Sequence, residues 1–344
     1  MQESTPTRRS LLVGDNARRD DVDQAWEQDN QAWWDWYVSL AQPEAPHGRQ
    51  APVDDTDDMP LAAASAPPAL DGDVHAFLQT PYALSEAQIG EFQRRGFLKL
   101  KNVLSAAVAA RLREEMVRLL EAAYASSLDG GTRARFLSLE LVWLENALIR
   151  AFVTSPRIAG IAGELLDVSG VRLYHDNLMS KEPGCGRTPW HYDDHHFPLA
   201  TQEVVTAWIP AQAIPRRMGP LAFAHPIDVW KRVRDVPFNK FDTSYDQQVG
   251  EIFRDGEVAI DDSSFALGEV SFHHNLSFHT AGPNLTELSR VVLANTYFAD
   301  GARVLDRPTM VSGDWQKFMP GVAPGGLANS ALNPVCWSRV RAQP

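Results

Sequence analysis

Residues 188–198 read Thr-Pro-Trp-His-Tyr-Asp-Asp-His-His-Phe-Pro and gather histidines and aspartates between two prolines. In an extended segment, alternate side chains point to the same face. His191 and Asp193 are therefore expected to point together, while Tyr192 and Asp194 point away. One imidazole and one carboxylate are two of the three ligands in the facial triad of non-haem Fe(II) oxygenases. The stretch thus predicts an iron site that takes a second histidine from elsewhere in the chain.

The second histidine is predicted in the segment 272–284, which reads Phe-His-His-Asn-Leu-Ser-Phe-His-Thr-Ala-Gly-Pro-Asn. His279 begins a His-x-x-Gly-Pro-Asn turn and ends a short predicted strand at 277–279. His273 would share the face of His279 if the strand were unbroken. The turn after His279, and Arg290 eleven positions later, favour His279 as the ligand.

Arg290 opens the last predicted strand, whose inner face would also carry Val292, Ala294 and Thr296. A lone arginine on the apolar inner face of a small barrel is costly unless an anion pairs with it. Guanidinium binds a carboxylate through two parallel hydrogen bonds. An iron triad with a buried arginine is what an Fe(II) enzyme that uses 2-oxoglutarate requires, because the keto acid chelates the metal and the arginine holds its far carboxylate.

The rest of the chain predicts helices first and short strands afterwards. Ser85 and Ser105 are candidate helix N-caps. The predicted helices cover 85–95, 105–125, 139–152 and 156–166, with one strand at 96–100. Short strands then follow at 171–181, 203–209, 221–224, 268–274, 277–279 and 289–298, and the tail beyond Asp300 is expected to be irregular. This order favours an α+β fold with a β-barrel or jelly-roll core.

Composition limits the function classes. The formal net charge is −12, which argues against nucleic acid as a partner. Residues 1–75 hold fifteen Asp and Glu against five Lys and Arg, so the acidity belongs mainly to the N-terminal part. An uninterrupted run of about 18 apolar residues, which a membrane span needs, is not seen. The two cysteines, Cys185 and Cys336, are too few for a disulfide scaffold and fit a cytoplasmic protein.

We therefore predict an acidic N-terminal extension at 1–75 and a catalytic domain at 76–344 with an insertion at 226–256 that is mixed in character and partly helical. The extension contains a predicted tryptophan-rich helix at 20–40, followed by a linker rich in Pro, Ala and Asp. The aromatic stripe of this helix favours docking on the core, and the alternative is a lid over a substrate site. The insertion and the extension are where we expect substrate specificity to reside.

The motifs resemble those of the phytanoyl-CoA dioxygenase family over about residues 85–300. The resemblance rests on His191-x-Asp193, His279 and Arg290, with Gly-Pro-Asn at 282–284 between the last two. Supporting matches are Tyr-His-Asp-Asn-Leu at 174–178, Lys-Glu-Pro-Gly at 181–184, Asp193 to Pro198, Ala-Trp at 207–208 and Gly-Pro-Leu at 219–221. The resemblance implies a double-stranded β-helix core, of jelly-roll or cupin type, supported by N-terminal helices.

The resemblance also implies the site. His191, Asp193 and His279 would bind Fe(II), and Arg290 would bind 2-oxoglutarate. Trp208 and Asn177 match positions that line the cosubstrate site, and Thr206 shares the predicted inward face of Trp208 and could donate a hydroxyl. The implied reaction uses O2 to oxidise, and by preference hydroxylate, a C–H bond of a small organic molecule, with succinate and CO2 as coproducts.

Two positions depart from the family pattern. Tyr192 stands where the family commonly has Gln, and Phe-Ala-His-Pro at 223–226 stands where Pro-Gly-Ser-His is common. Both affect the expected contacts of substrate and cosubstrate and leave the metal ligands intact. Retention of Asp193 argues against halogenation, because related halogenases replace this carboxylate to make room for chloride.

Other residues in these motifs have more ordinary interpretations. His195 and His196 are out of phase with the ligands and are expected to support the site or the fold. Asp194 is expected to bond a nearby loop, and Tyr192 to serve in packing. Arg216 and Arg217 are expected near the barrel mouth, where a solvated pair is favoured over contact with an acidic substrate.

Alternative functions stay open at this level. The same cofactors also support desaturation, ring closure or epoxidation of a natural-product intermediate. A zinc hydrolase or a cupin-type isomerase could use the same ligands but would have no use for Arg290. A non-catalytic barrel that binds a small molecule would not need the triad and the arginine together.

Overall fold

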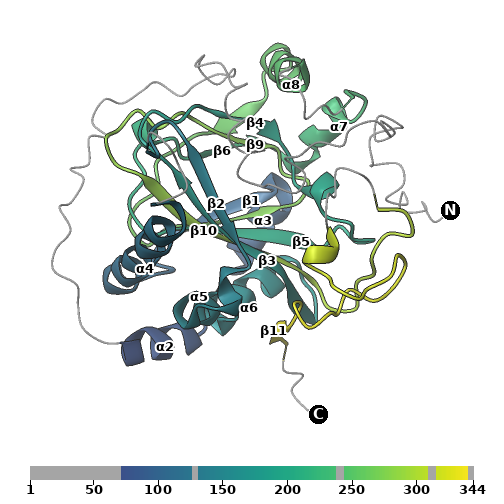
Figure 1. The fold of residues 1–344 in the computed structure, drawn as a ribbon. Helices are drawn as coiled ribbons and strands as arrows, with labels where there is room; N and C mark the ends of the chain where they lie inside the picture. Colours follow the sequence, from purple (N-terminus) through teal and green to yellow (C-terminus); the bar gives the residue numbers. More distant parts are fainter. Residues whose placement is uncertain (1–70, 126–130, 238–243, 309–314, 340–344) are drawn as a thin grey trace.

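The computed structural model describes residues 71–125, 131–237, 244–308 and 315–339 (Figure 1). The predicted tryptophan-rich helix at 20–40 and the acidic extension up to residue 70 lie outside these ranges. The first described element, α2 (Asp71–Gln79), crosses the boundary that the sequence predicts between residues 75 and 76.

Two antiparallel sheets form the centre of the fold (Figure 1). The large sheet has the order β1 (Phe97–Leu100), β8 (Val270–His274), β5 (Val204–Pro210), β10 (Arg290–Ala299) and β3 (Gly170–Lys181), and both β2 (Phe136–Glu140) and β11 (Val335–Ser338) pair with β3. The small sheet has the order β4 (Thr188–His191), β9 (His279–Ala281), β6 (Leu221–His225) and β7 (Ala259–Asp261). The sheets pack face to face as a double-stranded β-helix, which confirms the predicted α+β class.

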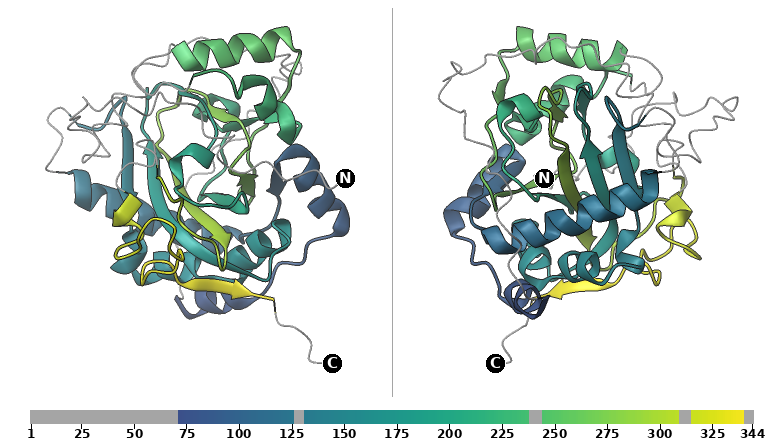
Figure 2. Two further views of the ribbon diagram at one scale, coloured as in Figure 1. Left: turned by 90° about the vertical axis from the view of Figure 1, so that its right-hand side faces the viewer. Right: turned by 60° about the vertical axis from the view of Figure 1, so that its left-hand side comes forward.

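Helices cover the outer face of the large sheet, as predicted for the N-terminal half. They are α3 (Glu86–Arg95), α4 (Ala106–Tyr124), α5 (Ala147–Val153) and α6 (Pro156–Leu165), and α4 lies across the strands in the right-hand view of Figure 2. Ser85 and Ser105 accept hydrogen bonds from the first turns of α3 and α4, so both predicted N-caps are confirmed. The apolar sides of these helices and of β3, β5 and β10 form the largest hydrophobic core.

A second apolar cluster fills the space between the two sheets. Phe223 of β6 and Trp208 of β5 belong to this cluster, together with Val292 and Ala294 of β10. The inner face of β10 is therefore apolar at Val292 and Ala294, as the sequence predicts. Every residue of β10 is buried, because a central strand covered on both sides has no solvent face.

The insertion forms the outer layer of the small sheet. It contains a short 3-10 turn (Ile227–Val229), α7 (Trp230–Val233) and α8 (Ser244–Asp255), which confirms that it is partly helical. Phe253 of α8 packs edge to face on Trp190 and Phe278, with ring centroids 5.2 Å and 5.5 Å away. In Figure 2, α8 lies at the top of both views, at the opposite end of the molecule from α2.

The predicted helix at 139–152 is wrong in its first half. Residues 136–140 form β2, which pairs with the C-terminal end of β3. Leu141 then has a left-handed backbone with φ of 57°, a 3-10 turn follows at Val142–Leu144, and α5 begins only after the N-cap Asn146. The free edge of β3 supplies hydrogen-bond partners that a helical pattern in the sequence does not reveal.

Two further predictions need correction. His279 begins β9 rather than ending a strand at 277–279. The tail beyond Asp300 is not wholly irregular, because it contains a 3-10 turn (Trp315–Lys317) and β11, which pairs with the N-terminal end of β3. A strand of four residues is too short to give a clear periodicity, and only its pairing with β3 defines it.

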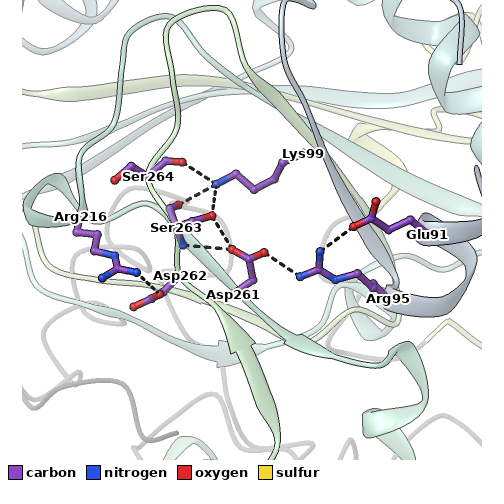
Figure 3. A network of polar contacts seen from close by, with 8 residues as sticks. All are labelled: Glu91, Arg95, Lys99, Arg216, Asp261, Asp262, Ser263 and Ser264. Atoms are coloured by element: carbon purple, nitrogen blue, oxygen red, sulfur yellow. Dashed lines mark hydrogen bonds and ion pairs between the residues drawn. The ribbon is translucent and has the colours of Figure 1, made fainter. Parts of the chain in front are cut away.

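A polar network fastens the edge of the barrel to the N-terminal helices (Figure 3). Arg95 of α3 bridges Glu91 and Asp261, each at 2.8 Å. Lys99 of β1 donates to the carbonyls of Ser263 and Ser264, both at 2.8 Å. The segment after β7 is thus held in place before the chain enters β8.

Candidate metal centre

His191, Asp193 and His279 come together at one end of the small sheet. His191 is the last residue of β4, and His279, the first residue of β9, is its direct register partner. One ligand atom from each of the three side chains lies within 4.8 Å of the others. Two imidazole nitrogens and one carboxylate oxygen at these separations could hold a metal ion.

The turn after β4 brings Asp193 back to the histidine. β4 ends at His191, and a 3-10 turn (Asp194–His196) follows, so the strand alternation assumed from the sequence stops two residues before Asp193. The backbone N–H groups of Asp193 and Asp194 donate to the carbonyl of Asn275 at 3.0 Å and 2.9 Å. The side chain of Asn275 donates to Asp194 at 2.7 Å, so Asp194 faces away from the triad, as predicted.

Backbone carbonyls fix the tautomers of both histidines. Nδ1 of His191 lies 2.8 Å from the carbonyl oxygen of Pro189, and Nδ1 of His279 lies 3.0 Å from that of Ser277. Each Nδ1 therefore carries the proton and donates it, which leaves Nε2 free as a ligand. These Nε2 atoms lie 4.0 Å and 3.7 Å from Oδ1 of Asp193. Burial lowers the pKa of both imidazoles, and this favours the neutral form that binds metals.

Asp193 is held by two further side chains. Nε2 of His273 lies 3.3 Å from Oδ2 of Asp193, and the hydroxyl of Thr206 donates to the same oxygen at 3.3 Å. Burial alone would raise the pKa of Asp193, but the imidazoles of His279 and His273 outweigh it and lower that pKa below its usual value. His273 therefore supports the carboxylate, a role that its face-sharing with His279 could have suggested from the sequence.

Arg290 lies inside the barrel at the start of β10 and is 2% exposed. Its Nη1 donates to the carbonyl of Gly219 at 2.5 Å, and its guanidinium carbon lies 5.3 Å from the ring centre of Trp208. Among the described residues, Nε of Arg290 has no hydrogen-bond partner. Burial lowers the pKa of Arg290 to about 10, so the side chain stays cationic at neutral pH. An anion would pair with the unmatched donor.

Lys181 of β3 is the direct register partner of Arg290 and is fully buried. Its Nζ donates to the carbonyl of Gly282 at 2.8 Å and to the hydroxyl of Thr188 at 3.1 Å. Burial and the neighbouring Arg290 lower the pKa of Lys181 well below its usual range. The sequence places Lys181 in a matching motif but gives no sign that it joins β3 to the turn between His279 and Arg290.

The other predicted site residues are distributed along the inner faces of the large sheet. Trp208 is cross-strand partner of Ala294 and stacks near Arg290. Asn177 is the partner of Ala294 on the other side, and its Oδ1 accepts a hydrogen bond from Ser138 at 2.8 Å. Thr206 lies at the metal triad rather than at Arg290. The structure thus places Trp208 beside Arg290 and Thr206 beside Asp193.

Residues that were predicted to serve in packing or at the surface mostly lie in such positions. Tyr192 is buried and packs on Phe278, with ring centroids 4.8 Å apart. Arg216 pairs with Asp262 at 3.1 Å, which is drawn in Figure 3, and Arg217 is exposed. His196 is partly buried in the 3-10 turn, and the position of the His195 side chain is not among the described features.

A double-stranded β-helix with a His-x-Asp…His triad and a buried arginine defines the class of Fe(II)- and 2-oxoglutarate-dependent oxygenases. The model of the phytanoyl-CoA dioxygenase (PhyH) family matches residues 92–292. The chain therefore belongs to the phytanoyl-CoA dioxygenase family and is an Fe(II)/2-oxoglutarate-dependent dioxygenase. The matched residues contain the triad and Arg290, which confirms the family assigned from the motifs.

Solved structures share the fold. The non-haem α-ketoglutarate-dependent carbocyclase SnoK from nogalamycin biosynthesis is 21% identical, with a TM-score of 0.61 over 74% of this chain and 99% of its own. The epimerase SnoN from the same biosynthesis is 21% identical, with a TM-score of 0.57 over 73% and 98%. EctD from S. alaskensis, solved with 2-oxoglutarate and 5-hydroxyectoine, is 18% identical, with a TM-score of 0.54 over 82% and 96%.

A search of curated proteins gave no match to this sequence. In the described parts of the chain, every helix is too short or too polar to cross a membrane.

Proposed function

We propose that His191, Asp193 and His279 hold Fe(II), that Arg290 holds the far carboxylate of 2-oxoglutarate, and that the enzyme hydroxylates a C–H bond of a small organic molecule. Succinate and CO2 are the coproducts. One observation carries the proposal: a triad of metal-ligating atoms and a buried guanidinium with an unmatched N–H belong to the same barrel.

The residues fit this pair of cofactors in charge and in donor type. Two neutral imidazoles and one carboxylate leave positions on the metal open for other ligands. Arg290 supplies a buried positive charge for the carboxylate that does not touch the metal. When bound, iron and 2-oxoglutarate supply the oxidising chemistry, in which O2 is activated as the keto acid is decarboxylated.

The chain's own contribution is to orient the ligand atoms and to exclude water from them. The carbonyls of Pro189 and Ser277 keep the Nε2 atoms of both histidines deprotonated and directed at the metal position. His273 and Thr206 keep Asp193 ionised and limit its rotation. Burial of His273, His279 and Arg290 strengthens their electrostatic contacts, because the local dielectric is low.

Binding measurements under anaerobic conditions test the proposal. Apo-protein is titrated with Fe(II) and then with 2-oxoglutarate, and the expected result is a weak visible metal-to-ligand charge-transfer band. His279→Ala should abolish both metal binding and the charge-transfer band. Arg290→Ala should still bind the metal but should bind 2-oxoglutarate more weakly. Arg217→Ala, at an exposed arginine, is the matched control. A wild-type protein that binds neither iron nor 2-oxoglutarate would overturn the proposal.

The substrate is to be identified by turnover. Succinate release is measured with panels of small molecules, and mass spectrometry of each product distinguishes addition of one oxygen from loss of two hydrogens. Products that consistently lack added oxygen would contradict the proposed hydroxylation. We place the enzyme in the cytoplasm, because its two free, buried cysteines suit a reducing compartment.

A further inference from the structure

Helix α8 of the insertion lies beside β4, the strand that carries His191 (Figure 1). Asp246 of α8 is buried. Its Oδ1 accepts the backbone N–H of Trp190 at 2.6 Å and a hydrogen bond from Nη1 of Arg187 at 3.1 Å. Its Oδ2 pairs with Nη2 of Arg187. One carboxylate of the insertion is thus bonded to Arg187, directly before β4, and to Trp190, directly before His191.

The bond to Trp190 occupies a gap in the strand pairing. β4 pairs with β9 at Thr188 and at His191, with a register shift between the two pairs. The N–H of Trp190 lies within this irregularity, and a buried N–H without a partner destabilises the folded state. The Asp246 carboxylate accepts it instead, in a charge-assisted bond that is stronger than a neutral one.

The same peptide group also fixes the tautomer of His191. The carbonyl of Pro189 and the N–H of Trp190 belong to one planar peptide unit, so holding the N–H sets the direction of the carbonyl. That carbonyl accepts the Nδ1 proton of His191 at 2.8 Å. A carboxylate on the N–H end also polarises the unit and makes its carbonyl a better acceptor.

We propose that Asp246 is a positioning residue for the iron site: through the Pro189–Trp190 peptide it orients His191 and directs its Nε2 to the metal. The inference rests on the proposed function, because it takes His191 as an iron ligand. His279 has its own carbonyl, that of Ser277, so the effect of Asp246 falls on one of the two histidines. A side chain of the insertion thereby affects metal affinity, in addition to the packing of the insertion on the small sheet.

Arg187 completes the arrangement. It is buried, pairs with Asp246, and donates to the hydroxyl of Thr280 on β9 at 3.2 Å. Thr280 in turn donates to the carbonyl of Thr188 at 2.5 Å. Because Arg187 pairs with Asp246, the buried carboxylate has a partner of opposite charge.

Two variants of Asp246 test its contact with the Trp190 N–H by removing the charge alone or the whole carboxylate. Asp246→Asn keeps an oxygen acceptor but removes the charge, and Asp246→Ala removes both. Affinity for Co(II), a spectroscopic substitute for Fe(II), is measured on apo-protein by competition with a chelator. We expect dissociation constants to rise about 10-fold for Asn and more for Ala, the range known for partners of metal-ligating histidines.

The matched control separates positioning from helix docking. Val249→Ala removes a fully buried side chain from the same helix but leaves the carboxylate in place. It should lower Tm while Co(II) affinity stays at the wild-type value. Glu251→Gln, at an exposed acidic position of α8, should change neither.

A second readout follows the tautomer directly. Long-range 15N–1H NMR of labelled apo-protein should show His191 protonated at Nδ1 in the wild type and in a mixture of tautomers in Asp246→Asn, with His279 unchanged. Wild-type Co(II) affinity together with an unchanged His191 tautomer in Asp246→Asn would overturn the inference. This result differs from failure of the proposed function, in which the wild-type protein itself binds neither iron nor 2-oxoglutarate.

Discussion

Nε2 of His273, on the large sheet, lies 3.3 Å from Oδ2 of Asp193, in the turn that follows the small sheet. The contact joins the two halves of the barrel at the metal centre. It also orients the carboxylate, because Oδ1 of Asp193 is then the oxygen nearer to His191 and His279.

Replacement of His273 should weaken the metal site without removing a ligand. In His273→Ala, Asp193 loses one of its two side-chain partners, and metal affinity is expected to fall about 10-fold. Competition between a chelator and Co(II) measures the change. His274→Ala is the control, because its ring packs near Phe92, on the outer side, with centroids 6.3 Å apart. Equal losses in both variants would show a general effect on β8 and contradict the prediction.

Arg290→Lys keeps a positive charge but loses the fork of donors. We expect 2-oxoglutarate affinity to drop by about 10- to 100-fold while metal affinity is unchanged, since charged hydrogen bonds contribute about 1.5–3 kcal/mol. Isothermal titration of the apo-protein with Mn(II) measures the metal affinity, and titration of the Mn(II)-loaded protein with 2-oxoglutarate measures the cosubstrate affinity. Arg217→Lys serves as the matched exchange at an exposed position. Unchanged 2-oxoglutarate affinity in Arg290→Lys would remove Arg290 from the cosubstrate site.

Gly219 tests the backbone that meets Arg290. Its φ is +73°, and a Cβ there would lie 2.2 Å from the carbonyl oxygen of Gly282. Gly219→Ala should therefore lower both stability and 2-oxoglutarate affinity, because the Gly219 carbonyl accepts from Arg290. Gly301→Ala is the control, with φ of +87° and no atom near the added Cβ. In urea unfolding, the free energy of unfolding of this variant should fall only by the cost of the backbone strain, about 1–2 kcal/mol. Similar behaviour of the two variants would exclude the close approach as a cause.

Asp176 gives the fold a pH dependence of known sign. Burial raises the pKa of Asp176 to about 7, well above its value in an unfolded chain. The native state therefore binds this proton more tightly, so this group's contribution to stability is greatest below about pH 4 and is lost as pH rises towards 7. Asp176→Asn keeps an acceptor for the N–H of Trp143, which lies 3.1 Å from the carboxylate.

Urea unfolding at pH 5 and pH 8 tests this prediction. The stability of Asp176→Asn relative to wild type should be higher at pH 8 than at pH 5, by on the order of 1–3 kcal/mol. Asp255→Asn, at an exposed position of α8, should show no such difference. A wild-type protein whose stability relative to Asp176→Asn rises with pH would have the opposite linkage and would contradict the assignment.

Local chemistry in the sequence was sufficient for several features. The serine N-caps at 85 and 105, the long apolar strand at 289–298 and the turn after His279 each depend on neighbouring residues only. The family motifs also predicted that His191, Asp193 and His279 share one barrel with Arg290, because the order and spacing of these residues are typical of that fold. These are the features that the structure and the family match support.

Long-range pairing decided the remaining features. Residues 136–140 form a strand rather than a helix because the edge of β3 is open beside them, and β11 exists through the same edge. The carboxylate of Asp246 meets Trp190 across 56 positions of sequence, and Lys181 meets Gly282 across 101. The sequence by itself determined which residues can bind a metal and an anion. Only the tertiary structure decided which buried groups surround them, because hydrogen-bond partners from distant strands are set by sheet register and not by local pattern.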